Sequence, residues 1–197
     1  MEITAKLVAD LRKQTNAGMM DCKKALVECE GDIEKAAEHL RKKGIAKAAK
    51  KAGRATANGL VECYIHPGGQ VGVMVEINCE TDFVARTDEF KSFVHDIAMH
   101  VAASGPQGID RDAIDAAVVE KEAEIYRAQM REEGKPDNII DKIVQGKIDK
   151  FYTEVCLLEQ KFVKDSDMTI AELVKSKIGS LGENMEIKRF VRYEIGG

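Results

Sequence analysis

The sequence predicts an α+β protein, in which an N-terminal three-helix bundle precedes a small antiparallel sheet layered with helices and a helical hairpin. Three observations predict this class: three short amphipathic helical patterns before residue 44, a change to two-residue alternation from Leu60, and strand patterns near both ends of the remaining chain with helical patterns between them. A chain of 197 residues is long enough for one or two domains with a buried core.

Each of the first three helices is marked by a cap or a break. Thr4 can cap the first helix, and the stretch over residues 15–18 ends it because Asn and Gly tolerate positive φ. A second helix is expected over about residues 20–30. Asp32 then caps a third helix, which Gly44 is expected to stop.

A basic, alanine-rich segment follows the bundle. Residues 43–54 carry five basic side chains, and their alanine content favours helix. We interpret Lys47, Lys50, Lys51 and Arg54 as a solvated face. Gly53 and Gly59 bracket a flexible joint. We therefore predict a domain boundary that separates residues 1–54 from residues 55–197.

A β-hairpin is expected after this boundary. From Leu60 the side chains alternate with a period of two, and Pro67-Gly68-Gly69 supplies a turn before a second alternating stretch that reaches Ile77. Thr87 then opens an amphipathic helix that ends near Ser104-Gly105-Pro106.

A helical hairpin is expected over about residues 111–157. Its link is Gly134-Lys135-Pro136, Asp137 is the expected cap of its second helix, and helices joined this tightly lie antiparallel. A last helix over residues 170–178 precedes a terminal strand over residues 185–195, whose odd-numbered side chains are predicted to share one face.

The composition argues against several classes of protein. A net charge of −4 and a pI of about 5.7 lack the basic footprint of a nucleic-acid binder, so no direct nucleic-acid partner is expected. No apolar run is long enough to span a membrane, and the first six residues lack the pattern of a secretory signal. Five cysteines without a C-x-x-C pair favour neither a disulfide framework nor a zinc site and predict a reducing, cytoplasmic location.

The sequence carries no pattern that catalysis requires. It has no P-loop, no dinucleotide-binding glycine motif and no nucleophile elbow. His95 and His100 are five residues apart, which puts them on different faces of their helix. We therefore predict a binding protein that is not an enzyme and has neither a cofactor nor a metal site, with an enzyme that uses Cys79 or His100 as the alternative.

The connection over residues 78–86 has two interpretations. An acidic residue, Asp82, beside the large apolar Phe83 in a short link between strand and helix is suited to insertion into another protein. Alternatively, Thr81 or Asp82 caps a helical turn and Phe83 packs into the core, as aromatic residues usually do.

Two long motifs resemble those of the elongation factor Ts family. Residues 81–86 (TDFVAR) are similar to its signature, and residues 15–26 (TNAGMMDCKKAL) resemble its N-terminal motif. Asn16 stands where the family more often has Gly, and Asn is the next best residue at a positive φ. Further similar segments follow in the family's order along the chain: residues 41–44, 47–54, 76–80, 160–165 and 189–194.

The resemblance implies a guanine-nucleotide exchange factor for the GTPase elongation factor Tu. It implies a ubiquitin-associated-like bundle within residues 1–54 and a core, residues 55–197, that grips the GTPase. The Thr81-Asp82-Phe83-Val84 stretch would insert near the partner's switch region and dislocate its Mg²⁺, so that GDP leaves and GTP can bind.

The N-terminal module is implied to touch the same GTPase. Arg12, Met19 and Met20 match residues at that contact, although from the pattern alone a Met pair at a helix start is often core packing. The bundle by itself also suggests an alternative function, a ubiquitin-associated-type peptide-binding adaptor without exchange activity. That alternative leaves residues 55–197 unexplained.

The chain resembles the short form of the family, with a single core subdomain. About three core strands are few for a sheet with flanking helices, and a second copy can replace the second subdomain of longer members. We therefore expect a homodimer, with residues 60–77 and 185–195 as candidates for its interface. The hairpin at about 111–157 is either an arm that touches the partner or structural support.

Overall fold

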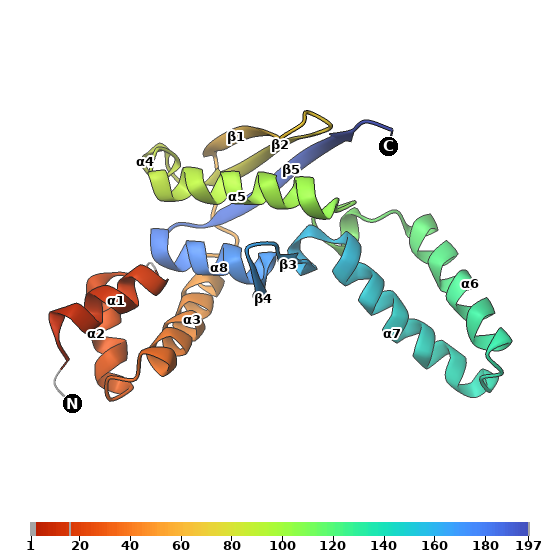
Figure 1. Ribbon diagram of the computed structural model, residues 1–197, viewed down its shortest axis with the longest axis horizontal. Coiled ribbons are helices and arrows are strands. Elements are labelled where there is room, and N and C mark those ends of the chain that lie inside the picture. Colours follow the sequence, from red (N-terminus) through yellow and green to blue (C-terminus); the bar gives the residue numbers. More distant parts are fainter. Residues whose placement is uncertain (1–2, 16, 197) are drawn as a thin grey trace. The chain divides into compact units, whose positions relative to one another are not determined.

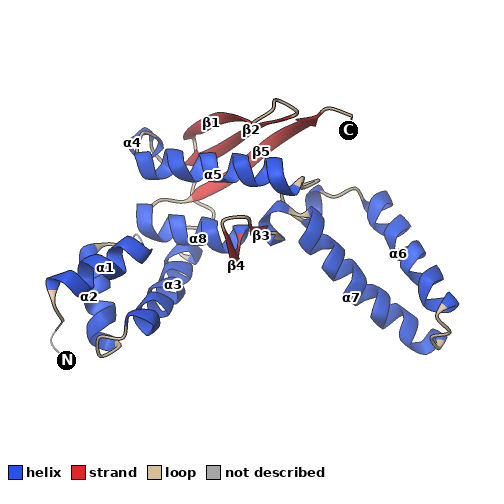
Figure 2. Ribbon diagram, in the orientation of Figure 1, coloured by secondary structure: helices blue, strands red, loops and turns tan. Residues whose placement is uncertain are grey.

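The structure of this chain is a computed structural model that describes residues 3–15 and 17–196 (Figure 1). Helices and a small antiparallel sheet make up the chain, which confirms the predicted α+β class (Figure 2). Asn16, in the predicted break, lies outside the described residues. The helices and strands are, in chain order, α1 (Ala5–Thr15), α2 (Met19–Glu28), α3 (Ile33–Ala49), β1 (Asn58–Ile65), β2 (Val71–Cys79), α4 (Asp82–Ala85), α5 (Asp88–Ser104), α6 (Ala116–Glu132), α7 (Asp137–Val155), β3 (Lys161–Phe162), β4 (Asp165–Thr169), α8 (Ile170–Leu181) and β5 (Met185–Glu194).

The chain divides into two compact units, each assembled from segments that are far apart in the sequence. The first unit comprises the residues up to 62 together with 75–95 and 172–188, and the second comprises 63–74, 96–171 and the residues from 189 onward. The boundary predicted between residues 54 and 55 concerns independent folding and stays a prediction.

Helices α1, α2 and α3 form the predicted N-terminal bundle. Leu11, Cys22 and Leu26 are fully buried at its centre. The predicted cap of α3 is confirmed, since the Asp32 carboxylate accepts the Lys35 N–H at 3.0 Å. These short helices depend on this shared apolar core, because isolated helices of such length are marginal in water.

The predicted end of α3 at Gly44 is wrong, because the helix continues to Ala49. One glycine costs a helix only about 1 kcal/mol, and the alanine-rich residues that follow Gly44 are strong helix formers. The glycine serves a contact instead. A Cβ atom on Gly179 of α8 would lie 3.0 Å from the Gly44 Cα, so the two helices approach closely here.

The interpretation of the basic side chains as a solvated face holds for Lys50 and Arg54, which are exposed, whereas Lys47 and Lys51 bind neighbouring elements. Arg41 donates to the Glu172 carboxylate at 2.8 Å, and Lys51 donates to the carbonyl oxygen of Gly182. Lys47 donates to Asp21 of α2 at 2.9 Å. These contacts reinforce the approach of α3 to α8 and hold α2 against α3.

Within the described residues, β1, β2 and β5 form a three-stranded sheet in that order. The predicted hairpin of β1 and β2 and the helix that begins near Thr87 are confirmed. Each unit contains part of α5 and part of the sheet, and in each unit that part of α5 covers one face of that part of the sheet (Figure 2). The buried side chains Val73, Val75 and Ile77 alternate along β2 as a half-covered strand requires.

The prediction that the odd-numbered side chains of β5 share one face is wrong. Met185 and Ile187 are buried, but Val191 and Tyr193 are exposed. Two consecutive exposed residues, at positions 188–189, shift the alternation by one place. Because the side-chain period is two, this shift moves the later odd-numbered side chains to the opposite face of the sheet.

Helices α6 and α7 form the predicted helical hairpin (Figure 1). Its first helix begins at Ala116 rather than 111, because residues 111–113 form a 3-10 turn. Pro136 is the N-cap of α7, so Asp137 is its first residue and not its cap as predicted. The short hairpin of β3 and β4 follows and was not predicted.

Replacing Gly179 by alanine should destabilise the protein. The added methyl group meets the main chain of Gly44, and a net loss of about 1 kcal/mol is expected once overpacking exceeds the gain in helix propensity. Gly146 of α7 is the matched control, since a Cβ there meets nothing within 4 Å. Gly146→Ala should therefore stabilise by roughly 0.5–1 kcal/mol. Urea unfolding measures both variants, and equal stabilisation of both would contradict the close approach of α3 and α8.

Candidate partner-binding site

The connection between β2 and α5 is built around a single helical turn, α4. Thr81 has extended backbone angles and caps this turn, with its hydroxyl oxygen accepting the Val84 N–H at 3.4 Å. Ala85 is buried beneath the turn, and Val84 is half-buried. The turn therefore stands on the fold with its first residues pointing outward.

Phe83 is the most exposed large apolar residue of the described chain, with 80% of its surface accessible. Of the two interpretations of this connection, the cap at Thr81 is confirmed and core packing of Phe83 is wrong. Asp82 next to it is half exposed and pairs with Arg86 at 2.8 Å across one helical turn. An acidic and an aromatic side chain are thus presented together.

The base of this turn is held from two sides. Behind it, the buried Cys79 thiol donates to the Thr81 carbonyl oxygen at 3.1 Å. Beside it, the Thr81 N–H and hydroxyl donate to the two carboxylate oxygens of Glu183, at 3.0 and 2.6 Å. The Glu80 carboxylate accepts the Asn184 N–H at 2.6 Å. The exposed turn therefore has a fixed base.

No pattern in the sequence indicates that Glu183 and Asn184 support the turn. They lie in the link between α8 and β5, where Gly182 indicates only a turn. Glu183 is 102 residues from Thr81, so no local pattern joins the two. They reach the turn because they directly precede β5, which lies beside β2 in the sheet, and β2 leads into the turn.

The N-terminal residues Arg12, Met19 and Met20 are all exposed. Met19 and Met20 open α2 with 48% and 66% of their surfaces accessible, so the interpretation of this pair as core packing is wrong. These residues lie on the bundle, whereas Thr81, Asp82, Phe83 and Val84 lie on α4 and its cap.

Neither Cys79 nor His100 has the environment of a catalytic group. Burial raises the pKa of the Cys79 thiol above its ordinary value, and the nearby Glu183 carboxylate raises it further. His100 is fully buried between Gln160, at 3.0 Å from its Nε2, and the Val163 N–H, which donates to its Nδ1. Burial lowers the pKa of His100, so the ring is neutral and structural.

Across residues 3–15 and 17–196, no group of three or more histidine, cysteine, aspartate or glutamate side chains is arranged to hold a metal ion. No helix in the same part of the chain is both long and apolar enough to cross a membrane.

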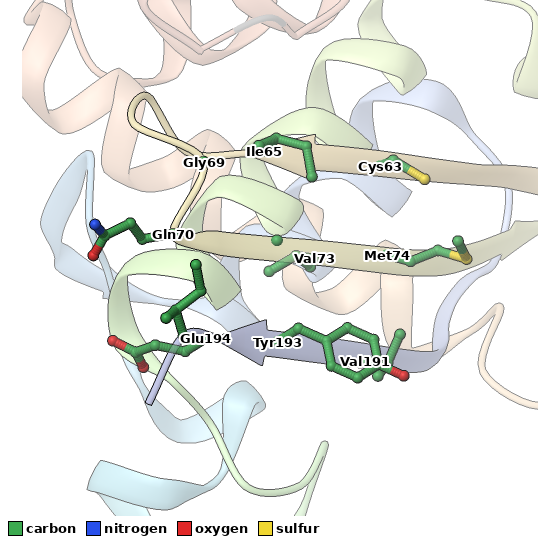
Figure 3. A pocket seen from close by; sticks show the side chains of 11 residues that line it. Cys63, Ile65, Gly69, Gln70, Val73, Met74, Val191, Tyr193 and Glu194 are labelled. Atoms are coloured by element: carbon green, nitrogen blue, oxygen red, sulfur yellow. The ribbon is translucent and has the colours of Figure 1, made fainter. Parts of the chain in front are cut away.

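The second unit has an apolar surface on the sheet face opposite α5 (Figure 3). Its exposed side chains line a shallow groove of about 380 Å³. Tyr193 and Ile195 are each more than 70% exposed there, at 73% and 74%. This outer sheet face consists of Cys63 and Ile65 of β1, Met74 of β2, and Val191, Tyr193 and Ile195 of β5 and its extension.

Comparison with known proteins matches the chain from end to end. Residues 2–197 match the family described as Elongation factor TS. Elongation factor Ts of Geobacter metallireducens is 59% identical over 196 residues, which is 100% of this chain and 91% of that protein. Elongation factor Ts of Fervidobacterium nodosum is 55% identical over 196 residues and matches over 100% of both chains. This chain belongs to the elongation factor Ts family.

Membership of the elongation factor Ts family assigns the chain to translation elongation and protein biosynthesis. It also confirms the resemblance found in the TDFVAR and TNAGMMDCKKAL motifs. An elongation factor Ts from Geobacter sulfurreducens is 58% identical over 100% of this chain. The family match covers residues 55–197 as well as the bundle. The alternative function as a peptide-binding adaptor is suggested by the bundle alone and leaves most of the matched chain unexplained.

Removing the Phe83 side chain should leave the stability of this elongation factor Ts family member nearly unchanged. An exposed side chain contributes little to folding, so Phe83→Ala should shift the free energy of unfolding by no more than about 0.5 kcal/mol. Phe90 is the matched control, because it lies seven residues later and is fully buried. Phe90→Ala should cost about 3–5 kcal/mol. Denaturant unfolding measures both, and a loss at Phe83 as large as that at Phe90 would mean that Phe83 packs into the core.

Proposed function

We propose that this chain is a guanine-nucleotide exchange factor for elongation factor Tu, and that the Thr81-Asp82-Phe83-Val84 turn is the element that acts on the partner. The observation that supports this most is Phe83, an aromatic side chain that folding leaves 80% exposed on a turn with a fixed base. Exposed aromatic residues on a rigid support are the usual anchors of protein interfaces. The chain itself makes and breaks no bond.

The proposed mechanism is a displacement of the partner's Mg²⁺ surroundings. Mg²⁺ demands near-ideal octahedral geometry and bridges the nucleotide phosphates to the GTPase. Insertion of Phe83, with the carboxylate of Asp82 beside it, disturbs that geometry and weakens the hold on GDP. The carboxylate adds a competing negative charge where the metal and the phosphates interact.

Thermodynamic linkage determines what such a factor can do. An exchange factor that binds the nucleotide-free GTPase more tightly than the nucleotide-bound form lowers the affinity of the GTPase for nucleotide. Bound nucleotide lowers the affinity of the GTPase for the factor by the same ratio. The factor therefore speeds release without choosing the nucleotide, and an excess of GTP over GDP gives the exchange its direction.

The N-terminal module, residues 1–54, is proposed to add affinity to the same complex. Met19 and Met20 present flexible apolar side chains on the same bundle as the exposed, cationic Arg12, and methionine and arginine are both common at protein interfaces. Binding through two separate surfaces raises overall affinity, since the second contact forms within the complex. A cytoplasmic location and the absence of nucleic-acid and membrane partners belong to the same proposal.

We also propose that the chain forms a homodimer through the outer sheet face of its second unit. Apolar surfaces of this kind are uncommon on monomers and mark interaction sites. A second copy is the occupant that the surface suits, because the face is largely uncharged and a two-fold axis would set this apolar face against the same face of the other copy. Burial of these side chains would give the sheet apolar layers on both sides.

Asp82→Ala and Phe83→Ala should slow GDP release from elongation factor Tu. Loss of a central interface anchor costs about 1.4 kcal/mol or more, which is roughly tenfold or more in the release rate. Stopped-flow release of fluorescent GDP from the full complex measures the effect, with thermal unfolding recorded on the same samples. Val163→Ala is the matched control, since Val163 is 46% exposed and belongs to the second unit, whereas the turn belongs to the first. Normal release by both turn variants would show that the turn does not act on the GTPase.

Light scattering should give a mass of about twice 21.7 kDa for the wild-type chain at tens of micromolar, with and without reductant. Tyr193→Lys and Ile65→Lys should shift it to a monomer, because each puts a charge where two copies would bury an apolar side chain. Val163→Lys, an equal change elsewhere on the second unit, should leave the dimer intact. A wild-type monomer at these concentrations would contradict the proposal.

A further inference from the structure

The turn that carries Phe83 is attached to the fold by a reciprocal pair of hydrogen bonds. Glu183 accepts the main-chain N–H of Thr81 at 3.0 Å, and Glu80 accepts the main-chain N–H of Asn184 at 2.6 Å. Each of the two segments thus supplies a carboxylate to the backbone of the other. Hydrogen bonds to carboxylates are about twice as strong as neutral ones.

We propose that Glu183 is a positioning residue for nucleotide exchange, which sets the orientation of the turn that presents Asp82 and Phe83. This inference rests on the proposed exchange function. Glu183 does not itself reach the partner in this scheme, because it is half-buried behind Thr81. It acts through the main chain of the turn.

The cap of α4 alone is too weak to orient the turn. The Thr81 hydroxyl accepts the Val84 N–H at 3.4 Å, which is long for a hydrogen bond. Four residues of helix also cannot sustain themselves, since the first turn is the costly step of helix formation. Something outside α4 must therefore fix its N-cap residue, Thr81.

Glu183 supplies that constraint through both of its carboxylate oxygens. The Thr81 hydroxyl has one proton, and it donates that proton to Glu183 at 2.6 Å. Because this proton is engaged, the lone pairs of the hydroxyl oxygen are directed toward the Val84 N–H and accept it. A carboxylate accepts only, so it fixes both the proton direction and the rotamer of Thr81.

Among the described residues, the exposed side of the turn offers no equivalent support. The Asp82–Arg86 ion pair is half exposed and joins residues of the same turn, so it moves with the turn. Cys79 holds the Thr81 carbonyl oxygen from behind with a thiol, which is a weak donor. Loss of the Glu183 contact should therefore let the turn rotate, and misplacement of about 1 Å in a reacting geometry can cost up to a hundredfold.

Hydrogen exchange of the free protein tests the positioning directly. In Glu183→Gln the side chain keeps its shape, but its amide nitrogen faces one of the two Thr81 donors. The amides of Thr81 and Val84 should exchange about tenfold faster by NMR, while the amide of the buried Val75 in β2 keeps its rate. Glu186→Gln is the matched control, because Glu186 is three residues away and its carboxylate contacts Thr56 and Lys188 instead.

Nucleotide release then separates positioning from simple stability. For Glu183→Gln, the maximal rate of GDP release at saturating factor should fall about tenfold, while the half-saturating concentration changes less than about twofold, since the N-terminal contact is intact. Thr81→Val, which removes the hydroxyl, should also slow release. The double variant should be no slower than the slower single variant, because both changes break the same hydrogen bond.

The two arms distinguish the possible failures. Unchanged exchange of the Thr81 and Val84 amides in Glu183→Gln would overturn the positioning role, whatever the release rate. Faster amide exchange with a wild-type maximal rate would overturn it too, while the exchange function would stand. Absence of GDP release by the wild-type chain would overturn the proposed function, and the inference with it.

Discussion

The close approach of α3 to α8 at Gly44 and Gly179 is the contact on which the first unit depends. With no side chain on either glycine, the two helices lie close enough that a Cβ on Gly179 would be 3.0 Å from the Gly44 Cα. The Arg41–Glu172 ion pair and the Lys51 contact with Gly182 lie on either side of this point. Helix α8 leads directly into Glu183, so one continuous path of packed elements joins the N-terminal bundle to the base of the exposed turn.

This path has a physical consequence for the proposed exchange. An aromatic side chain that folding leaves in water gains nothing from the core, so Phe83 can be presented only if its backbone is held by other means. The hydrogen bonds at Thr81 and the buried thiol of Cys79 hold that backbone. Preorganisation of this kind lowers the entropy lost on binding, so more of the contact energy is available to displace the partner's metal.

Local patterns in the sequence were enough to predict the caps at Asp32 and Thr81, the hairpin of β1 and β2, and the unusual pairing of Asp82 with Phe83, because each depends on neighbours in the chain. Three of the failures have a common cause. Gly44 was interpreted as a helix stop, although its role is a tertiary contact with a glycine far along the chain. The change of phase in β5 and the bond between Glu183 and Thr81 likewise depend on partners that no local pattern reveals.

The change of phase in β5 also produces the proposed dimer surface. It turns Val191 and Tyr193 to the face opposite α5, so the sheet of the second unit has apolar side chains on both sides and a single helix covers only one of them. The residues proposed to act on the GTPase, by contrast, all lie in the first unit. Because the two sets share no residue, self-association through the sheet does not use the side chains that are proposed to act on the GTPase. A chain with one core subdomain can thus complete its sheet with a second copy while each copy keeps its own exchange turn.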